Sequence, residues 1–553
     1  MYRHRLNKLL LTAFLAACWA GLPSCGSDDQ GDKANVVYLN YSSGALESID
    51  PAFAKNLYNM WTDHMVYNTL VETNEALQLV PSLARRWAVS ADGLTYTFYL
   101  RDDVYFQDNA VFPGGKGRKM VAADVVYSFG RLVDPAIASS GAWIFNDRVA
   151  RQEPFRAVND TTVQIKLLAP FRPLPEILTM PYCSIVPREV AEHYGKDFSR
   201  HPCGTGPYQF HYWDEGNVLI LHKNPHYWET DEQGERLPYT DAVQIGFADS
   251  KATEFFLFLQ GKVDFVNGLD GSFKDLVLTK NGELKKEYLS KIRFEKKTYL
   301  NTEYIGFLTD TANALVKASP TRYRLVRQAI NYAIDRKRIS TYFKNGMGTP
   351  ATSGFIPRGM PGYDSTGRYG YDYNPTKAMA LLKEAGFPGG KGLEPFTILT
   401  PDNWADIVNF VATQLQDVGI PAKVEIIQPN ILRQQMSRSQ AIAFRGQWLA
   451  DYPDGETYLA FFNSRFPAPP NYTRFAHATF DQWYDASMNA PDSLRHKLYQ
   501  RMDSLVMSEA PLVPLFYDQR MHFTQLNVSG FSSNPMNLID LKRVRKNNSQ
   551  RPQ

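Results

Sequence analysis

Side chains that could carry catalytic chemistry are frequent in this chain, but their spacing matches no catalytic motif. The sequence has no HExxH, no GxSxG and no dinucleotide-binding glycine fingerprint. His222 and His226 have the spacing of a helical metal pair, yet Pro225 lies between them and opposes a helix. Two FPGGKG segments, 112–117 and 387–392, lack the Ser or Thr that follows the lysine of a phosphate loop, so we expect turns there. We therefore expect no catalytic residue, no metal site and no cofactor.

Cys25 is the first of the cysteines with an interpretable context. It ends the segment LPSC, which follows three basic residues and an apolar run too short to span a bilayer. This pattern resembles a bacterial lipobox, so we expect a signal peptide over residues 1–24, a lipid on Cys25 and a tether over 25–36. An ordinary secretory signal is the alternative. The acidic pair after the cysteine resembles a surface-export signal, so the periplasmic face and the outer-membrane surface both remain open.

Cys183 and Cys203 are the other two cysteines of the exported chain. Exported proteins meet an oxidising compartment, where such a pair tends to be bridged. His193 and His201 are near, but the spacing fits no zinc motif. We expect a disulfide between Cys183 and Cys203, with two buried thiols as the alternative.

Charge and length restrict the class of protein. Without the three basic residues of 1–24, the 60 Lys and Arg become 57 and equal the 57 Asp and Glu. A neutral chain offers no basic face for nucleic acid, so we expect no such partner. More than 500 residues exceed one hydrophobic core and predict two or three lobes. Several basic residues close the chain, and we expect a solvated tail over 542–553.

Hydrophobic periodicity predicts strands mixed with helices. The segments 94–100 and 162–167 alternate apolar and polar residues, as half-buried strands do. The segment 324–339 has apolar residues at helical spacing. The clearest helix starts after Asn374, has Pro375 in its first turn and stops near Gly386. Interleaved strands and helices indicate the α/β class.

Several long segments together resemble one known family. The strongest is HPCGTGPYQFHYWDEGNVLILHKNPHYW at 201–228, and further segments agree in the family's order: 81–108, 122–135, 326–339, 448–464 and 513–520. They are similar to the family 5 extracellular solute-binding proteins, the peptide-, dipeptide- and nickel-binding components of ABC importers. The resemblance implies a two-lobed periplasmic-binding-protein-like fold of the large type II class, with a subdomain inserted in the first lobe.

The resemblance also implies domain boundaries. We expect lobe 1 to consist of 37–56, 180–297 and 514–541. The inserted subdomain is expected over 57–179 and lobe 2 over 298–513. In such proteins the two lobes close on the ligand about hinge strands.

The WLADY segment carries the ligand-binding residues that the resemblance implies. In oligopeptide-binding members the aspartate of this motif pairs with the ligand's α-ammonium group, and it corresponds to Asp451. A buried peptide terminus needs an opposite charge, and Trp448 could form a flat apolar wall beside it. Arg445 matches an arginine that some relatives direct at the peptide carboxylate. Trp143 lies where relatives have a cleft-lining loop.

Each of these residues also has a structural interpretation. Asp451 could cap a turn before Asp454 and Gly455. Arg445 could form a surface salt bridge, and Trp143 could be a core residue.

Taken with the lipobox, the resemblance predicts a lipid-anchored, monomeric binding protein that delivers a short peptide to an ABC permease. A metal chelate, a small sugar, or a surface enzyme or adhesin on the same scaffold are the alternatives.

Overall fold

The computed structural model describes residues 35–42, 44–269 and 271–547, so the expected signal peptide and Cys25 lie outside the described residues. The described residues from Val36 onward form one compact unit, and this unit contains the fold. Among the residues described, no helix is both long and apolar enough to cross a lipid bilayer.

The first lobe is built on a four-stranded sheet with the order β1-β10-β9-β8. β1 pairs in parallel with β10, and the other pairs are antiparallel. Alternate residues of β1 (Val37, Leu39 and Tyr41) are buried, because successive side chains of a strand point to opposite faces. The elements of this lobe are β1 (Val36–Tyr41), α5 (Arg188–Tyr194), β8 (Tyr208–Asp214), β9 (Val218–Lys223), β10 (Ala242–Phe247), α6 (Lys251–Leu259) and α7 (Gly271–Val277).

The inserted segment has its own four-stranded antiparallel sheet, with the order β4-β5-β7-β6, and a small β2-β3 hairpin. Tyr96, Phe98 and Leu100 are buried on one face of β5, which confirms the strand predicted at 94–100. The elements are α2 (Leu57–Val66), β2 (Val71–Thr73), β3 (Leu79–Pro81), β4 (Ala84–Val89), β5 (Thr95–Leu100), α3 (Ala122–Val133), β6 (Phe155–Asn159), β7 (Thr162–Lys166) and α4 (Leu174–Ile177).

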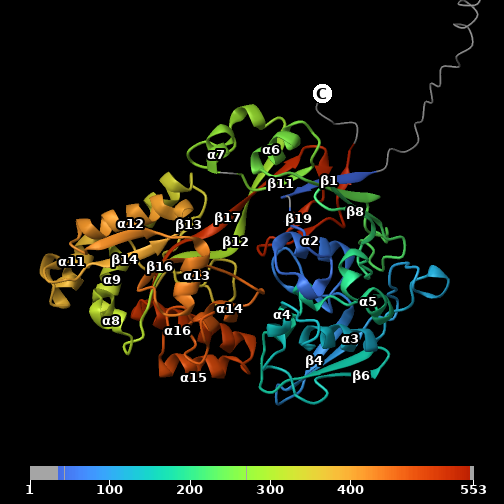
Figure 1. The fold of residues 1–553 in the computed structure, drawn as a ribbon, viewed down its shortest axis with the longest axis horizontal. Helices are drawn as coiled ribbons and strands as arrows, with labels where there is room; N and C mark the ends of the chain where they lie inside the picture. The colour runs from blue at the N-terminus through green and yellow to red at the C-terminus, as the bar shows by residue number, and fades with distance from the viewer. Residues whose placement is uncertain (1–34, 43, 270, 548–553) are drawn as a thin grey trace, which may run out of the picture. The chain divides into compact units, whose positions relative to one another are not determined.

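Two long antiparallel strands connect the lobes: β12 (Ile292–Phe307) and β17 (Leu512–Gln525). They belong to a sheet with the order β11-β17-β12-β16-β14-β15, and β13 pairs with β17. Figure 1 shows both strands running through the middle of the molecule, with β11 toward one end and β16 and β14 toward the other. A register irregularity lies between Thr298 and Thr302. The remaining strands are β11 (Phe265–Asn267), β13 (Thr349–Pro350), β14 (Phe396–Thr400), β15 (Ala422–Ile426) and β16 (Ala443–Leu449).

Helices pack on the second-lobe part of this sheet. α11 confirms the predicted cap, because Asn374 Oδ1 accepts a hydrogen bond from Lys377 N at 2.9 Å. α9 ends at Ala333, earlier than expected, because Asp335 starts a new turn by accepting from Arg338 N. The helices are α8 (Ala314–Ala318), α9 (Arg324–Ala333), α10 (Arg336–Arg338), α11 (Pro375–Glu384), α12 (Ala405–Asp417), α13 (Pro429–Ser437), α14 (Glu456–Leu459), α15 (Ala478–Ser487) and α16 (Asp492–Glu509).

The glycines of the HPCGTGPY motif have a packing role. A Cβ on Gly206 would lie 2.4 Å from the carbonyl carbon of Val66, and a Cβ on Gly204 would lie 2.3 Å from Val66 O. Glycine therefore lets the chain pass close to the end of α2 just before β8.

The described part of the basic tail is folded, which corrects the expectation of a solvated tail. Lys542 is buried in a cluster of carboxylates. β21 (Arg545–Lys546) pairs with β18 (Val528–Ser529), and β20 (Ile539–Asp540) pairs with β19 (Ser532–Ser533). The basic side chains have partners that are distant in sequence, and these were not visible in the composition of the tail.

Candidate functional site

A pocket of about 270 Å³ lies between the two lobes, and we name it the interlobe pocket. Residues of lobe 1 and of the inserted segment form one wall. The other wall consists of Tyr299 on β12, the end of β16 and the loop that follows it. The lining residues are Lys55, Asn56, Leu57, Met60, Thr73, Thr179, Met180, Pro181, Tyr299, Leu449, Ala450, Asp451, Tyr452, Pro453, Met536 and Leu538.

Asp451 is the acidic side chain of this pocket. No cation of the described chain lies within ion-pair distance of it, and its Oδ2 accepts only a long hydrogen bond, 3.5 Å, from Thr457 Oγ1. The residue has exposed surface because it borders the pocket, but the surrounding protein limits its hydration. This desolvation raises the pKa of Asp451 to about 6; Thr457 and Arg148 oppose the rise, and Glu456 adds to it.

Asp454, and not Asp451, makes the turn contacts. Its Oδ1 accepts from Glu456 N at 2.9 Å and from the Tyr499 hydroxyl at 2.7 Å, and Arg495 pairs with its other oxygen at 3.1 Å. The turn-capping role considered for Asp451 thus belongs to Asp454, and Asp451 is among the residues that line the pocket.

Trp448 does not line the pocket beside Asp451, contrary to the expectation. Leu449 borders the pocket, and adjacent residues of a strand point to opposite faces, so Trp448 faces the other side of β16. There its Nε1 donates to Thr457 O at 2.7 Å, and its ring packs against Phe461. Trp448 therefore supports the Asp451 loop from behind.

Arg445 is engaged inside lobe 2. Its Nη2 lies 2.5 Å from Glu303 Oε2, and its guanidinium lies 3.7 Å from the ring centre of Trp404. Burial raises the pKa of Glu303 to about 7 although Arg445 opposes this rise, and burial also lowers the pKa of Arg445. Arg445 is outside the pocket lining, and it forms a buried pair instead of the surface salt bridge considered as its alternative.

Trp143 lies in a turn at Ala142–Ile144 of the inserted segment. With 37% of its surface exposed it is not a core residue, and it does not border the interlobe pocket. Its carbonyl oxygen accepts from Arg148 Nη1 at 2.9 Å. The Arg148 charge in turn lowers the pKa of Asp451, so the turn acts on the pocket through Arg148.

Lys55 is a pocket residue that the sequence reasoning missed. It lies on the wall opposite to the lobe 2 loop and pairs with Glu47 at 2.6 Å, with both side chains about half exposed. It immediately precedes Asn56, which caps α2 through hydrogen bonds to Tyr58 N and Asn59 N. No spacing pattern singles out a lysine in this position, so Lys55 could not be identified from the sequence.

The expected disulfide is absent, because Cys183 and Cys203 are free, buried thiols. The Cys203 thiol points to Gln107 O at 3.4 Å, whereas Cys183 lies 3.9 Å from Ile177 O. Burial raises the pKa of both thiols. The alternative of two buried thiols therefore describes the structure.

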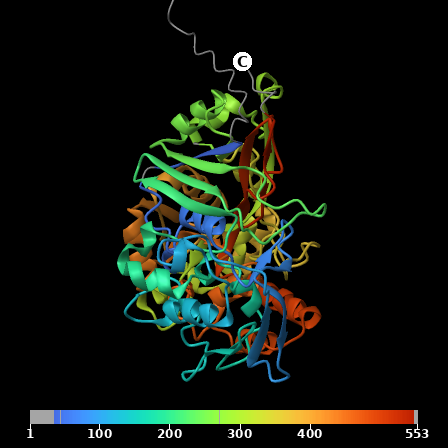
Figure 2. The same ribbon diagram turned by 90° about the vertical axis from the view of Figure 1, so that its right-hand side faces the viewer.

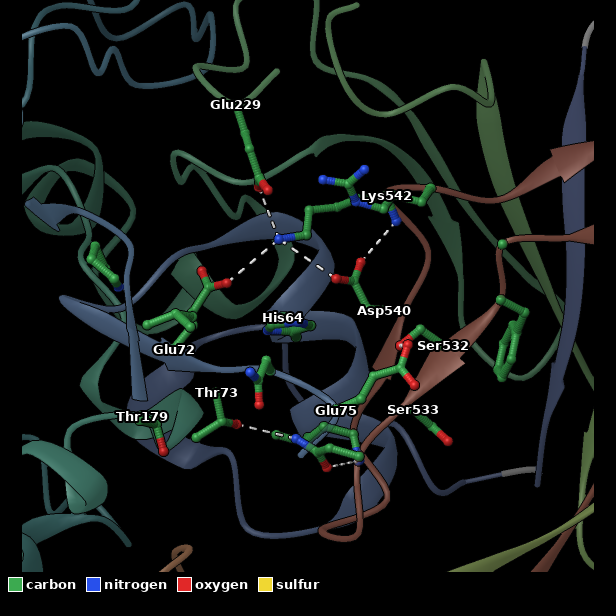
Figure 3. A pocket seen from close by; sticks show the side chains of 18 of the residues that line it. His64, Glu72, Thr73, Glu75, Thr179, Glu229, Ser532, Ser533, Asp540 and Lys542 are labelled. Atoms are coloured by element: carbon green, nitrogen blue, oxygen red, sulfur yellow. Dashed lines mark hydrogen bonds and ion pairs between the residues drawn. The ribbon is translucent and has the colours of Figure 1, made fainter. Parts of the chain in front are cut away.

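A second cavity, of about 390 Å³, adjoins the interlobe pocket and shares Thr73, Thr179 and Leu538 with it. We name it the acidic pocket (Figure 3). Lys542 Nζ lies 2.9 Å from Glu229, 3.5 Å from Glu72 and 3.5 Å from Asp540. Burial would raise the pKa of Glu72, but Lys542 and three further neighbours hold it at about 2. The acidic pocket is larger than the interlobe pocket. However, its cation Lys542 is already paired with carboxylates, and no lobe 2 residue is among those that line it.

No group of three or more His, Cys, Asp or Glu residues in the described part of the chain is placed to hold a metal ion.

Comparison with known proteins identifies the family. Residues 78–469 match the family described as bacterial extracellular solute-binding proteins, family 5. The glutathione-binding protein GsiB of Salmonella paratyphi A is 26% identical over 541 residues, covering 95% of this chain and 96% of that protein.

Solved structures agree in fold. HbpA2 from Haemophilus parasuis matches with a TM-score of 0.80 and 24% identity, over 93% of this chain and all of that chain. The periplasmic binding protein DppA of Helicobacter pylori, in complex with the peptide STSA, matches with a TM-score of 0.72 and 23% identity, over 93% and 98%. The α/β architecture with two lobes is thus that of periplasmic binding proteins, and the chain belongs to the family 5 bacterial extracellular solute-binding proteins.

Proposed function

We propose that this protein captures a short peptide in the interlobe pocket and delivers it for import, and that Asp451 binds the peptide's free α-ammonium group. The observation that carries this proposal is the carboxylate of Asp451, which borders a pocket and has no cationic partner in the described chain. A buried ammonium group needs an opposite charge, and a carboxylate with limited hydration gains most from receiving one.

The ionisation state of Asp451 is suitable for this task. With a pKa of about 6 the carboxylate is mostly charged at neutral pH. Lys55 provides a positive charge on the opposite wall, so a dipolar peptide meets complementary charges at both walls.

The names of similar proteins support a peptide-type ligand. GsiB is named for binding glutathione, a tripeptide, and DppA of Helicobacter pylori holds the peptide STSA. DppA is described as associated with an ABC transporter, which supports an ABC permease as the partner here. In our proposal the chain is a monomer held at the cell envelope by a lipid on Cys25.

The composition of the interlobe pocket favours a peptide over the alternative ligands. A metal chelate would favour histidine and arginine in the lining, and neither is among the lining residues. A sugar would favour several aromatic walls, whereas the lining contains two tyrosines, Tyr299 and Tyr452. The role is binding, and no catalytic step is proposed.

Isothermal titration with one short peptide, free and N-acetylated, tests the proposal. We expect the free peptide to bind the wild type much better than the acetylated one. Asp451→Asn should weaken binding of the free peptide by about 2 kcal/mol or more, because the ammonium group loses its partner. The variant should also discriminate less between the two peptides.

Asp310→Asn is the matched control, because Asp310 accepts from Ala312 N in a lobe 2 turn outside the pocket. It should leave the ratio of the two affinities unchanged. An unchanged ratio in Asp451→Asn as well would end the ammonium model. Native mass spectrometry of the purified protein would then identify a ligand retained from the cell.

A further inference from the structure

A cluster of large apolar side chains is exposed on the short helices α6 and α7 and the segment that follows them. Phe256, Leu259, Leu276 and Leu289 expose 51%, 39%, 56% and 60% of their surface. The half-buried ring of Phe273 joins them, since its centroid lies 5.5 Å from that of Phe256. We name these five residues the α6–α7 face.

The fold does not need this face for its own core. The opposite side of α6 already buries Phe255 and Phe258 in a cluster with Val266 and Phe523. α6 is thus apolar on both sides, whereas a surface helix of a soluble protein normally has one polar side. Large apolar side chains that are exposed together on one segment, 256–289, indicate an interaction surface.

Exposed basic residues accompany the α6–α7 face. Within the described chain, no ion pair or side-chain hydrogen bond engages the lysines of this segment that are exposed: Lys262, Lys280, Lys286 and Lys291. Two of the acidic residues in the segment are neutralised internally, Glu254 by Lys251 and Glu283 by Lys296. Asp275 and Glu287 are also exposed, but the four lysines outnumber them, and this excess of positive charge favours an anionic partner.

The start of the fold is fixed close to this face. Tyr38 N, in β1, donates to Asp264 Oδ2 at 2.7 Å, and Asp264 follows the end of α6 by five residues. Lys546 Nζ bonds both Asp264 and Val36 O at 2.7 Å. Figures 1 and 2 show α6 and α7 at the same end of the molecule as β1.

The tether limits how far this end can lie from a membrane. Cys25 precedes Val36 by 11 residues, which span at most about 40 Å when fully extended. A lipid on Cys25 therefore keeps the α6–α7 face within reach of the bilayer surface.

We propose that the α6–α7 face docks on anionic phospholipid headgroups of the membrane that holds the anchor. The apolar side chains enter the boundary between headgroups and acyl chains, and the lysines contact the anionic headgroups. This proposal rests on the lipidation proposed for Cys25 and is independent of peptide binding.

Vesicle co-sedimentation of a chain that begins at residue 26 tests the proposal. This chain lacks the lipid but keeps every residue that the structure describes. We expect it to bind phosphatidylcholine vesicles containing about 30% phosphatidylglycerol, to bind pure phosphatidylcholine vesicles much less, and to be released by salt. Phe256→Ser combined with Leu276→Ser should lower the ratio of bound to free protein at least about tenfold.

Leu315→Ser combined with Ile431→Ser is the matched control, because these lobe 2 residues expose 45% and 47% of their surface. It should leave vesicle binding unchanged. Lys280→Glu combined with Lys286→Glu, which removes no apolar contact, should also weaken binding to the anionic vesicles. Thermal unfolding checks that each variant folds.

Equal binding to both kinds of vesicle, no binding to either, or an equal loss in the control pair would overturn the membrane proposal. Titration of the same variants with peptide should show unchanged affinity. A failure of membrane docking is therefore distinguishable from a failure of the peptide-binding function, because vesicle binding is measured without peptide.

Discussion

The acidic pocket and the interlobe pocket adjoin each other and share three lining residues, but they differ in whether their charged side chains have partners of opposite charge. In the acidic pocket, Lys542 lies among three carboxylates that are distant in sequence (Figure 3). In the interlobe pocket, no cation of the described chain neutralises Asp451. We infer from this difference that the paired buried charges stabilise the fold, whereas the charge of Asp451 suits the ligand-binding role that we propose for it.

Lys542→Met should have the largest effect, and it should act on stability. It would leave Glu72, Glu229 and Asp540 close together without their cation, and breaking a buried ion pair in this way costs about 3–5 kcal/mol. Denaturant unfolding measures the change, with the exposed Lys383→Met as a control that should change little.

Asp451→Asn gives the contrasting result in the same measurement. Asp451 is exposed at the border of the pocket, and its carboxylate makes one long hydrogen bond in the described chain, so little stability depends on its charge. The variant should therefore be about as stable as the wild type. If Lys542→Met were harmless and Asp451→Asn destabilising, the roles that we give the two pockets would have to be exchanged.

The third prediction concerns the pH dependence of peptide affinity. In the proposed function Asp451 would bind an ammonium group only when it is ionised, so we expect the affinity to be fully present above the pKa of about 6 and to be lost as the pH falls below it. The loss approaches about tenfold per pH unit until the pKa of Asp451 in the complex is reached. Titrations from pH 8 to 5 measure it.

The same titrations with Asp451→Asn provide the control. An amide does not ionise, so the affinity of this variant should vary little over the range. A wild-type affinity that stays constant below pH 6 would show that Asp451 does not bind the ammonium group.

Local pattern predicted the elements well, because caps and alternation act over a few residues. Asn374 and Pro375 start α11 as expected, and the alternation over 94–100 became β5. The resemblance to the family indicated the lobes and placed Asp451 in a segment that borders the interlobe pocket.

Side-chain positions that depend on residues distant in the sequence could not be predicted from local pattern. Trp448 lies on the side of β16 that is opposite to the pocket, because the pairing of β16 with β12 determines which of its residues face each side. Arg445 is held by Glu303, which is 142 residues away in sequence. The burial of Lys542 likewise depends on Glu72, which lies 470 residues earlier.

The smallest predicted effect is that of substituting Lys55. This prediction sharpens the comparison of the two pockets, because Lys55 is a cation of the interlobe pocket whose partner is only weakly bound. Its pair with Glu47 is about half exposed on both sides, and such pairs contribute little to stability, so Lys55→Met should leave unfolding unchanged. If Lys55 attracts the peptide carboxylate, the wild type should bind a free peptide better than its C-terminal amide by about 0.5–1 kcal/mol. The Met variant should lose this preference while its preference for a free over an acetylated amino terminus persists, because Asp451 is unaltered.

Titration with the free, amidated and acetylated forms of one peptide separates the contributions of the two ends of the peptide. A carboxylate preference that survives in Lys55→Met would assign that charge to another cation. A preference lost at both ends would mean that the substitution distorts the wall that begins with the cap of α2.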